Sequence, residues 1–512
     1  MTPLALKVPR SWICAALASI SFAPWAAGAT KCEDLASLTL KGGTITASHV
    51  IAPGQFAPPG RAGGGAAATF AKLPAFCRVE ATLKPSSDSE IRMEVWLPAS
   101  GWNGKLVEAG NGAFAGSISY GPMASAVAAG YAATSSDTGH TGNSGAFILE
   151  HPEKLTDFAY RAVHENAIAA KSITEAFYGS GPTRAFFSGC STGGRQAMGE
   201  AQRYPADFDG IIAGAPAINT THLQAMQTWV GTSGHKDPAA LIPPSKFPMI
   251  HSAVLAACDL LDGVKDGVIE NPLRCTFNPA SLACTGGDGP GCLTAPQVEL
   301  VRKIYTGPVS ASGKQVFPGL ARGSEQGWNT LAGPQPMDFA VGVYQYVVFK
   351  NANWDYLSLD LDRDVAYADT VVGSIINNGD PNLKPFFSRG GKLLGYHGWS
   401  DPGITPQSSI NYYKSVAAAL GGEAAIANSY RLFLVPGMAH CGGGDGTSTF
   451  DMVAALDRWV DGGKAPESIP ASRTRNGSVD RTRPLCPYPQ EAVYKGSGST
   501  DDAASFTCAV KP

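Results

Sequence analysis

Residues 189–193 read Gly-Cys-Ser-Thr-Gly, which fits the pattern Gly-x-Ser-x-Gly around Ser191. This pattern is typical of a nucleophile elbow, a sharp turn between a strand and a helix that exposes a serine hydroxyl. Gly189 and Gly193 would leave room for the strained turn, and Gly194 would let the helix approach the sheet. The alternative is an ordinary glycine-rich turn with a solvated serine, in a chain that has 60 glycines.

A serine nucleophile needs a base, and the base needs an acid that orients it. In α/β-hydrolases these groups follow in the chain order Ser, Asp or Glu, His, each on a loop after a strand. Asp401 follows one apolar, strand-like run, and His440 follows the next in a glycine-rich loop. We therefore predict a triad of Ser191, Asp401 and His440. His397 lies closer to its strand, and we expect it to have a structural role.

Cysteines flank two of these three residues. Cys190 precedes Ser191, and Cys441 follows His440. Catalysis requires the serine and the histidine to come within hydrogen-bond distance, so their neighbours would also be close. A disulfide needs Cα atoms roughly 4.4–6.8 Å apart, and we infer that the two cysteines pair. The alternatives are two buried thiols, or pairing with other cysteines.

Two further loops contain residues suited to chemistry. The segment 105–116 is a strand that runs into the glycine-rich stretch 110–116, where a serine hydrolase would take one oxyanion-hole amide. A plain turn is the alternative. The segment 258–270 holds Asp259, Asp262 and Asp266 in a tight loop, and carboxylates of this kind suit Ca²⁺. Its spacing is not that of an EF-hand, and a solvated acidic turn is the alternative.

The elements around these residues alternate between the two kinds of hydrophobic pattern. Strand-like runs occur at 92–97, 105–109, 184–187, 208–216, 392–398 and 431–436, and helix-like runs at 157–178, 196–203, 407–420 and 450–460. This alternation predicts a parallel α/β sheet. It breaks between about residues 218 and 378, a segment rich in Pro and Gly with an aromatic cluster. We expect an inserted domain over the active edge of the sheet, with most of these aromatic residues in its core.

The composition narrows the class of protein. The 512 residues are 44% hydrophobic and 16% charged, and the net charge of −3 gives no electrostatic case for a nucleic acid or an anionic membrane as partner. Lys7 and Arg10, an apolar run over 12–25 and the small residues 27–29 resemble a signal peptide. A membrane anchor is the alternative, but the run is shorter than the roughly 20 residues of a span. We expect cleavage after residue 29 and a secreted or periplasmic protein.

Cysteine usage agrees with export. Without Cys14 in the predicted signal peptide, ten cysteines remain, and an even number in an exported chain suggests disulfides. Cys32 and Cys77 bracket the first strands and could pair. The chain contains no Cys-x-x-Cys motif, which argues against a zinc knuckle.

The combination of Cys190-Ser191, Asp401 and His440-Cys441 resembles the Cys-Ser…Asp…His-Cys signature of the tannase and feruloyl esterase family. The resemblance runs from about Cys32 to Cys508. It implies an α/β-hydrolase fold with a large inserted lid. The expected boundaries are 30–217 and 381–512 for the catalytic domain and 218–380 for the lid.

The resemblance also implies site residues. The oxyanion hole would use the amide of Thr192 and one from the loop 110–113, which we assign to Gly112. The lid would hold a structural calcium ion through Asp259, Asp262, Asp266 and the backbone oxygens of two valines. These are Val264 and Val268. The five implied disulfides are Cys32–Cys77, Cys190–Cys441, Cys258–Cys275, Cys284–Cys292 and Cys486–Cys508.

The function that follows from the resemblance is hydrolysis of small esters of aromatic acids, such as hydroxycinnamic acids, through an acyl-enzyme. Tannase activity or terephthalate monoester hydrolysis on the same scaffold is the alternative. A non-catalytic binding protein with a hydrolase fold is a third interpretation, and the presence of serine, acid and histidine argues against it. Nothing in the sequence indicates an oligomeric state.

Overall fold

The computed structural model describes residues 30–59 and 69–511, and its main element is a nine-stranded sheet. The strand order is β1-β2-β3-β5-β4-β6-β7-β8-β9. The strands are β1 (Gly43–Ile51), β2 (Phe76–Leu83), β3 (Ile91–Pro98), β4 (Lys105–Ala109), β5 (Ala132–Ser136), β6 (Arg184–Cys190), β7 (Gly210–Gly214), β8 (Lys392–Gly398) and β9 (Tyr430–Val435). The predicted signal peptide, residues 1–29, lies outside the described residues.

The sheet is antiparallel at its N-terminal edge and parallel elsewhere. β1, β2 and β3 pair antiparallel, and β3 also pairs antiparallel with β5. All pairs from β5 through β4, β6, β7 and β8 to β9 are parallel. The carboxyl ends of the parallel strands therefore meet at one edge, where catalytic loops of this fold class lie. The predicted α/β-hydrolase fold is confirmed.

Helices cover both faces of the sheet, as the strand sequences require. Consecutive apolar residues such as Phe186 and Phe187 point to opposite faces, and both are fully buried. On the face of Phe186 the sheet packs against α2 (Tyr120–Ala128) and α16 (Met452–Gly462). On the face of Phe187 it packs against α4 (Ala162–Tyr178), α5 (Thr192–Arg203) and α14 (Pro406–Ala419).

Two expectations about these elements were wrong in part. The alternation of polar and apolar residues over 92–97 predicts a half-buried strand, but every residue of β3 except Arg92 is buried. The reason is that β2 and β5 flank β3 and hydrophobic residues cover both of its faces. The apolar spacing over 157–178 predicts that Ile168 lies on the buried side of that helix, but Ile168 is 43% exposed. That helix begins with a π-helical turn, Asp157–Arg161, before α4. Such a turn alters the helical phase that the periodicity assumed.

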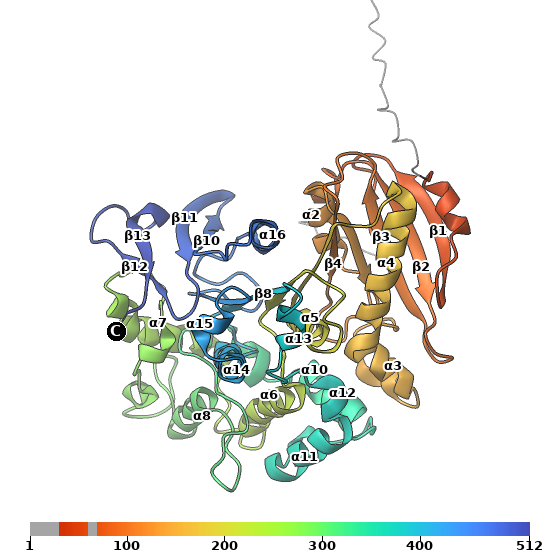
Figure 1. Ribbon diagram of the computed structural model, residues 1–512. Helices are drawn as coiled ribbons and strands as arrows, with labels where there is room; N and C mark the ends of the chain where they lie inside the picture. The colour runs from red at the N-terminus through yellow and green to blue at the C-terminus, as the bar shows by residue number, and fades with distance from the viewer. Residues whose placement is uncertain (1–29, 60–68, 512) are drawn as a thin grey trace, which may run out of the picture.

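The segment 215–391, between β7 and β8, adds no strand to the nine-stranded sheet. Its helices gather along one side of the molecule (Figure 1). They are α6 (Thr220–His235), α7 (Phe247–Cys258), α8 (Ala295–Thr306), α9 (Asn329–Ala332), α10 (Asp338–Gly342), α11 (Leu361–Ala368), α12 (Ser374–Ile376) and α13 (Lys384–Phe387). Trp328 and Phe247 lie in one buried cluster, whose other members, apart from Ile404, also belong to this segment. Hereafter this segment is called the insertion.

The C-terminal residues form two small antiparallel sheets that the sequence analysis did not predict. One pairs β10 (Ile469–Arg475) with β11 (Ser478–Leu485), and the other pairs β12 (Glu491–Tyr494) with β13 (Phe506–Ala509). They lie beside α7 of the insertion, near the C-terminus (Figure 1). Among the described residues, none of the helices combines the length and apolar character that a membrane crossing requires.

Candidate active site

Ser191 lies at the turn between β6 and α5, with φ 64° and ψ −118°. A positive φ is strained for a residue with a Cβ atom. The Ser191 amide donates to the Gly214 carbonyl on β7 at 2.9 Å, which holds the turn against the neighbouring strand. A Cβ atom on Gly189 would lie 2.5 Å from the carbonyl carbon of Gly193, and one on Gly194 would lie 2.3 Å from the Gly214 oxygen. The turn therefore has the geometry of a nucleophile elbow, and its glycines are sterically required.

The residue before Ser191 is bonded to the residue after His440. Cys190 and Cys441 form a disulfide whose Cα atoms are 6.0 Å apart, which confirms the inferred pairing. The other four implied disulfides are also present. The bond joins the serine turn to the histidine loop across 251 residues of sequence.

Asp401 and His440 meet at the carboxyl ends of β8 and β9. His440 Nδ1 donates to Asp401 Oδ2 at 2.6 Å. The other carboxylate oxygen, Oδ1, accepts the amides of Gly403 at 2.8 Å and Ile404 at 2.9 Å. The Asp401 side chain is fully buried, whereas the His440 side chain is 36% exposed. The carboxylate is thus fixed from both sides, and the imidazole presents its other nitrogen away from it.

The electrostatics of this pair suit a base and an orienting acid. Burial would raise the pKa of Asp401, but hydrogen bonds from His397 and His440 outweigh it and hold the pKa below its ordinary value. Burial lowers the pKa of His440, but the hydrogen bond and the charge of Asp401 outweigh it and raise the pKa overall. Asp401 is therefore ionised at neutral pH and stabilises an imidazolium on His440.

His397 is a second histidine beside the same carboxylate, but it is fully enclosed. Its Nε2 donates to the Ile404 carbonyl at 2.8 Å and lies 3.3 Å from Asp401 Oδ2, while its Nδ1 accepts from the Ser409 hydroxyl at 2.8 Å. Both ring nitrogens are engaged, and the side chain has no exposed surface. His397 holds Asp401 in place, in agreement with the structural role expected from the sequence.

The described residues include no hydrogen bond between Ser191 Oγ and the His440 ring. Their relation is set instead by the adjoining disulfide and by the two parallel strands, β6 and β9, that lead to them. Hydrogen bonds between a nucleophile and its base are often long without substrate and tighten in the complex. The arrangement therefore places a serine hydroxyl and a partly exposed imidazole at one edge of the sheet.

The loop after β4 approaches the serine turn closely enough to supply an amide. A Cβ atom on Gly193 would lie 2.9 Å from the Asn111 carbonyl oxygen. Within this loop, the Gly110 amide already donates to the Ser188 carbonyl, and the Asn111 amide donates to Gln196 Oε1, each at 2.9 Å. Gly112 is the next residue whose amide has no recorded acceptor among the described residues, and a Cβ there would meet nothing within 4 Å. Of the amides in this loop, that of Gly112 is therefore the first that is free to serve as the second oxyanion-hole donor.

Side chains that the sequence analysis missed hold this loop. Gln196 receives the Asn111 amide and donates to the Asn111 side chain at 3.2 Å. It follows Thr192 by four residues, so both lie on the same face of α5, a spacing that could have signalled the contact. His140 Nε2 donates to the Phe114 carbonyl at 2.8 Å. No motif marks His140, which reaches the loop from the turn after β5.

A match to a family model covers residues 77–509, and its description is "Tannase and feruloyl esterase". The chain belongs to the tannase and feruloyl esterase family. The sequence is 36% identical to an uncharacterized esterase of Xanthomonas campestris pv. campestris, with 95% of this chain and 92% of that protein covered. It is 35% identical to a probable feruloyl esterase B-2 of Aspergillus terreus, with 85% and 86% covered.

Solved structures agree with this membership. The crystal structure of an esterase from Aspergillus oryzae superposes with a TM-score of 0.88 at 32% identity, covering 93% of this chain and 99% of that one. A tannin acyl hydrolase from Aspergillus niger shares the fold, with a TM-score of 0.78 at 23% identity over 93% of each chain. This member of the tannase and feruloyl esterase family is a carboxylic ester hydrolase.

The acidic loop of the insertion is tightly folded. Both carboxylate oxygens of Asp259 accept backbone amides, from residues 266 and 267 at 3.2 and 3.0 Å. Asp262 accepts the Val264 amide at 2.8 Å, and Asp266 accepts the Val268 amide at 3.2 Å. The pKa of Asp262 is raised to about 6, first by burial and then by its acidic neighbours, against the opposing Val264 hydrogen bond.

This loop has the oxygen ligands of a calcium site, but they are not arranged around one common centre. Three carboxylates and the carbonyls of Val264 and Val268 are the hard oxygen ligands that Ca²⁺ prefers, and the described residues record no donor to either carbonyl. Asp266 Oδ2, however, pairs with Arg483 and lies 3.2 Å from Arg481. The described residues contain no cluster of three His, Cys, Asp or Glu side chains arranged to hold a metal. The calcium ion remains a prediction.

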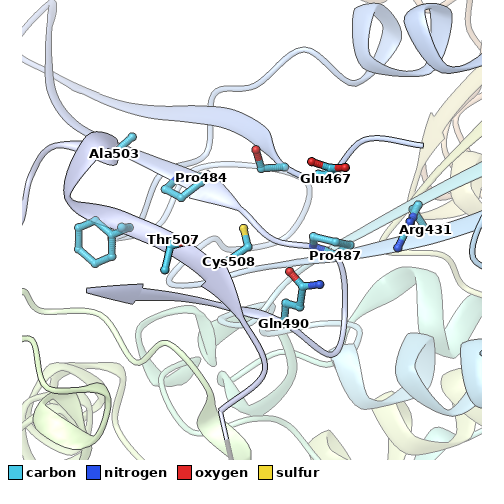
Figure 2. Close-up of a pocket in the computed structure, with 10 residues that line it drawn as sticks. Arg431, Glu467, Pro484, Pro487, Gln490, Ala503, Thr507 and Cys508 are labelled. Atoms are coloured by element: carbon cyan, nitrogen blue, oxygen red, sulfur yellow. The ribbon is translucent and has the colours of Figure 1, made fainter. Parts of the chain in front are cut away.

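A cavity of about 640 Å³ lies between β9 and the C-terminal sheets (Figure 2). Arg431, Glu467 and Gln490 give it a polar lining (Figure 2), and Phe506 is among its apolar lining residues. It contains none of the three predicted catalytic residues. The position of Trp399 two residues before Asp401 predicts a wall of the substrate pocket, but its side chain is only 4% exposed and packs in the core beside α14. Its amide continues the pairing of β8 with β9, so its side chain stays within the sheet packing.

Proposed function

We propose that Ser191, His440 and Asp401 are the nucleophile, base and orienting acid of this ester hydrolase. The observation that carries the proposal is the 2.6 Å hydrogen bond from His440 to the buried Asp401, on a loop that a disulfide ties to the strained Ser191 turn. A serine, an imidazole and a carboxylate in this chain order are the parts that acyl transfer needs.

In the proposed reaction His440 Nε2 takes the Ser191 hydroxyl proton as Oγ bonds to the ester carbonyl carbon. Asp401 stabilises the imidazolium, and the amides of Thr192 and Gly112 donate to the oxyanion of the tetrahedral intermediate. The bond from carbon to the alcohol oxygen then breaks, and His440 returns the proton to the departing alcohol. Water repeats these steps on the acyl-enzyme, releases the acid and restores the serine.

We propose an ester of an aromatic acid, of the hydroxycinnamoyl type, as substrate. Support comes from relatives named feruloyl esterase and from aromatic residues where the oxyanion loop meets the insertion. Phe114 of that loop packs edge-on against Phe339 of the insertion, with ring centroids 4.6 Å apart. Phe114 is buried, whereas Phe339 is partly exposed. We propose that the Phe339 ring favours a planar acyl group over a flexible aliphatic one.

The test of the triad is Ser191→Ala, assayed on methyl ferulate, methyl gallate and a nitrophenyl ester. We expect kcat to fall by about 10⁴-fold or more with the fold intact, since the alanine cannot form an acyl-enzyme. Ser415→Ala is the matched control, because among the described residues the Ser415 hydroxyl bonds only to the Tyr412 carbonyl of its own helix. Wild-type activity in Ser191→Ala, or inactivity of the wild type on all three esters, would contradict the proposal.

The same three substrates separate the candidate specificities. A preference for methyl ferulate over methyl gallate supports the feruloyl esterase assignment, and the reverse supports tannase activity. A terephthalate monoester, added as a fourth substrate, tests the remaining alternative. The measurement is kcat/KM, because it compares transition-state binding of competing substrates.

We also propose that the mature protein is exported, secreted or periplasmic, after cleavage of residues 1–29. The five disulfides support this, because such bonds persist in oxidising compartments. N-terminal sequencing of the exported protein should begin at Thr30. An unprocessed N-terminus on a membrane-bound product would favour the anchor alternative.

A further proposal is that the loop 259–268 binds calcium through Asp259, Asp262, Asp266 and the carbonyls of Val264 and Val268. When bound, the ion would offset two of the three carboxylate charges and fix the loop; it would supply no catalytic chemistry. Val268 lies against the histidine loop, since a Cβ on Gly437 would be 3.1 Å from its Cγ1. Bound calcium would thereby restrict the motion of the segment that packs against the His440 loop.

Metal analysis of the purified protein tests this proposal. We expect about one Ca²⁺ per chain, and a lower melting temperature after chelation that added Ca²⁺ restores. Asp262→Asn should lose most of both effects, whereas Asp355→Asn, at an exposed helix cap of the insertion, should keep them. A metal-free protein that does not change its melting temperature on Ca²⁺ addition would contradict the proposal.

A further inference from the structure

A buried histidine of the insertion reaches the loop that carries His440. His251 is on α7 and is only 5% exposed. Its Nδ1 donates to Glu325 Oε2 at 2.9 Å, and its Nε2 lies 3.4 Å from Asp445 Oδ2. Glu325 begins a short helical turn of the insertion, and Asp445 is five residues beyond His440. These three residues are called the bridging cluster below.

Both carboxylates of the bridging cluster are held by other groups. Glu325 is fully buried, and its Oε1 accepts the Tyr305 hydroxyl and the Gly323 amide, each at 2.7 Å. Asp445 is partly exposed; its carboxylate accepts from Gln326 at 3.4 Å, and its backbone carbonyl accepts from Arg473 at 2.6 Å. His251 Nε2 is a buried nitrogen without a full hydrogen bond, so its interaction with Asp445 is an ion pair across 3.4 Å.

The charges facing His251 favour its protonated form. Glu325 and Asp445 lie on its two sides, Tyr305 donates to Glu325, and Arg473 and Arg475 face Asp445 from β10. Burial lowers the pKa of His251, but the interactions with Asp445 and Glu325 outweigh it and raise the pKa to about 9. An imidazolium with a carboxylate on each side neutralises one of two negative charges that would otherwise repel each other.

The same part of the insertion also touches the loop of Asp401. A Cβ atom on Gly327 would lie 2.4 Å from Pro402 Cγ, and one on Gly323 would lie 3.5 Å from Ser400 Oγ. Gln326, between these glycines, donates to Asp445 Oδ2 at 3.4 Å. Residues 323–327 therefore contact the loop of Asp401 (the acid loop), and they contact the loop of His440 (the base loop) through Gln326 and through the bridging cluster.

We propose that charged His251 is a positioning residue. It links the insertion to the loops of Asp401 and His440 and keeps the His440 ring aligned with Asp401 and Ser191. The proposal rests on the triad proposed above. His440 sits on a loop closed at its base by the Met438–Gly444 bridge and by the Gly446 amide on the Gly437 carbonyl. Asp445 lies where this loop closes, so a displacement of Asp445 would also displace the residues of the loop, including His440. Without the positive charge, Asp445 and Glu325 repel each other across the interface.

The sign of the expected pH effect follows from the raised pKa. The imidazolium is present below about pH 9, and it is lost as the pH rises through that value. In the wild type we therefore expect kcat/KM to fall on the alkaline side near pH 9, in addition to the acidic limb that His440 sets. Asp445→Asn removes one of the two partners that raise this pKa, so its alkaline limb should move to lower pH.

The experiment compares His251→Gln, Asp445→Asn and the control His222→Gln with wild type and Ser191→Ala, on methyl ferulate from pH 6 to 10. His222 is also a histidine of the insertion paired with an aspartate, Asp369 at 2.9 Å, but none of its recorded partners is on the acid or base loop. We expect His251→Gln to lower kcat by about 10- to 100-fold, with KM nearly unchanged and no alkaline limb near pH 9. His222→Gln should retain wild-type kcat and pH profile.

Separate outcomes overturn the inference and the proposed function. An inactive wild type, or an active Ser191→Ala, would overturn the triad and this inference with it. If Ser191→Ala is inactive but folded His251→Gln matches wild type, only the inference fails. A His251→Gln protein that loses activity but keeps the alkaline limb would also overturn it, because a general loss of packing would do the same. If His251→Gln does not fold, Asp445→Asn decides by the position of its alkaline limb.

Discussion

The two halves of the candidate site are built from different kinds of interaction. On the serine side, the Ser191 turn and the loop after β4 are shaped by backbone atoms that approach so closely that only glycine fits at positions 189, 193 and 194. On the acid–base side, Asp401 and His440 are held by side-chain hydrogen bonds and charge. The serine side should therefore fail when atoms are added, and the acid–base side when charge is removed.

The disulfide between Cys190 and Cys441 is the covalent link between these halves. One end lies at the carboxyl end of β6, and the other is in the loop after β9, which the insertion contacts through the bridging cluster. The disulfide thus fixes the sterically shaped Ser191 turn relative to the His440 loop, which is held by hydrogen bonds and charge. The following substitutions test this difference between the serine side and the acid–base side. We expect the largest loss of kcat where a charge is removed that no neighbouring group can replace.

Removal of the Asp401 charge should give the largest effect on the acid–base side. Asp401→Asn keeps the volume and can still accept the amides of Gly403 and Ile404, but it no longer stabilises an imidazolium on His440. We expect kcat to fall by about 10⁴-fold with little change in melting temperature. Asp355→Asn, at an exposed helix cap, is the control. A fall in kcat of less than tenfold would mean that another group orients His440.

Addition of one methyl group should disrupt the serine side. A Cβ on Gly194 would lie 2.3 Å from the Gly214 carbonyl oxygen and 2.8 Å from Pro216 Cα, so the helix must move away from β7. We expect Gly194→Ala to destabilise the protein by about 1–3 kcal/mol and to lower kcat by about 100-fold. Gly181→Ala, where a Cβ meets nothing within 4 Å, is the control. Equal melting temperatures and kcat values for the two variants would contradict a sterically built turn.

These two sides also differ in how far the sequence predicts them. The order of Ser191, Asp401 and His440 could be predicted because each follows a strand-like run, and strand ends of a parallel sheet share one edge. The amide of Gly112 could not be singled out from sequence alone. Gly110 and Asn111 are engaged by Ser188 and Gln196, contacts that only the folded chain defines.

The strand order and the C-terminal sheets were likewise beyond the sequence patterns. β5 reads Ala-Ala-Thr-Ser-Ser, too short and too uniform in size to give a hydrophobic period, yet it is fully buried between β3 and β4. The polar β10 and β11 are held by side chains such as Arg473, which pairs with Asp480 at 2.9 Å. Such pairs depend on partners across a turn rather than on periodicity. The bridging cluster has the same origin, since His251 and Asp445 are 194 residues apart in the numbering.

Removal of the link between the halves should affect stability more than removal of a local disulfide. In the chain-entropy model, the 251-residue separation of Cys190 and Cys441 corresponds to about 5–6 kcal/mol. The eight-residue separation of Cys284 and Cys292 corresponds to about 2.5 kcal/mol. We expect the double variant Cys190→Ala/Cys441→Ala to lose more melting temperature than Cys284→Ala/Cys292→Ala, and to lose activity as well. Unchanged activity and thermal stability would show that the disulfide does not clamp the serine to the base.

The smallest effect is a displacement of the acidic limb of the pH profile. His440 must be neutral to accept the serine proton, and its pKa is raised above the ordinary value by Asp401 despite burial. In the wild type kcat/KM should fall about tenfold per pH unit below a midpoint that lies above 6.5. In Asp401→Asn the residual activity should show this limb at lower pH, because burial then lowers the pKa without the opposing carboxylate. If the acidic limb of Asp401→Asn stays at the wild-type pH, the titrating group is not His440. If the limb shifts in Asp401→Asn but not in Gly194→Ala, the electrostatic and the steric sides of the site act separately.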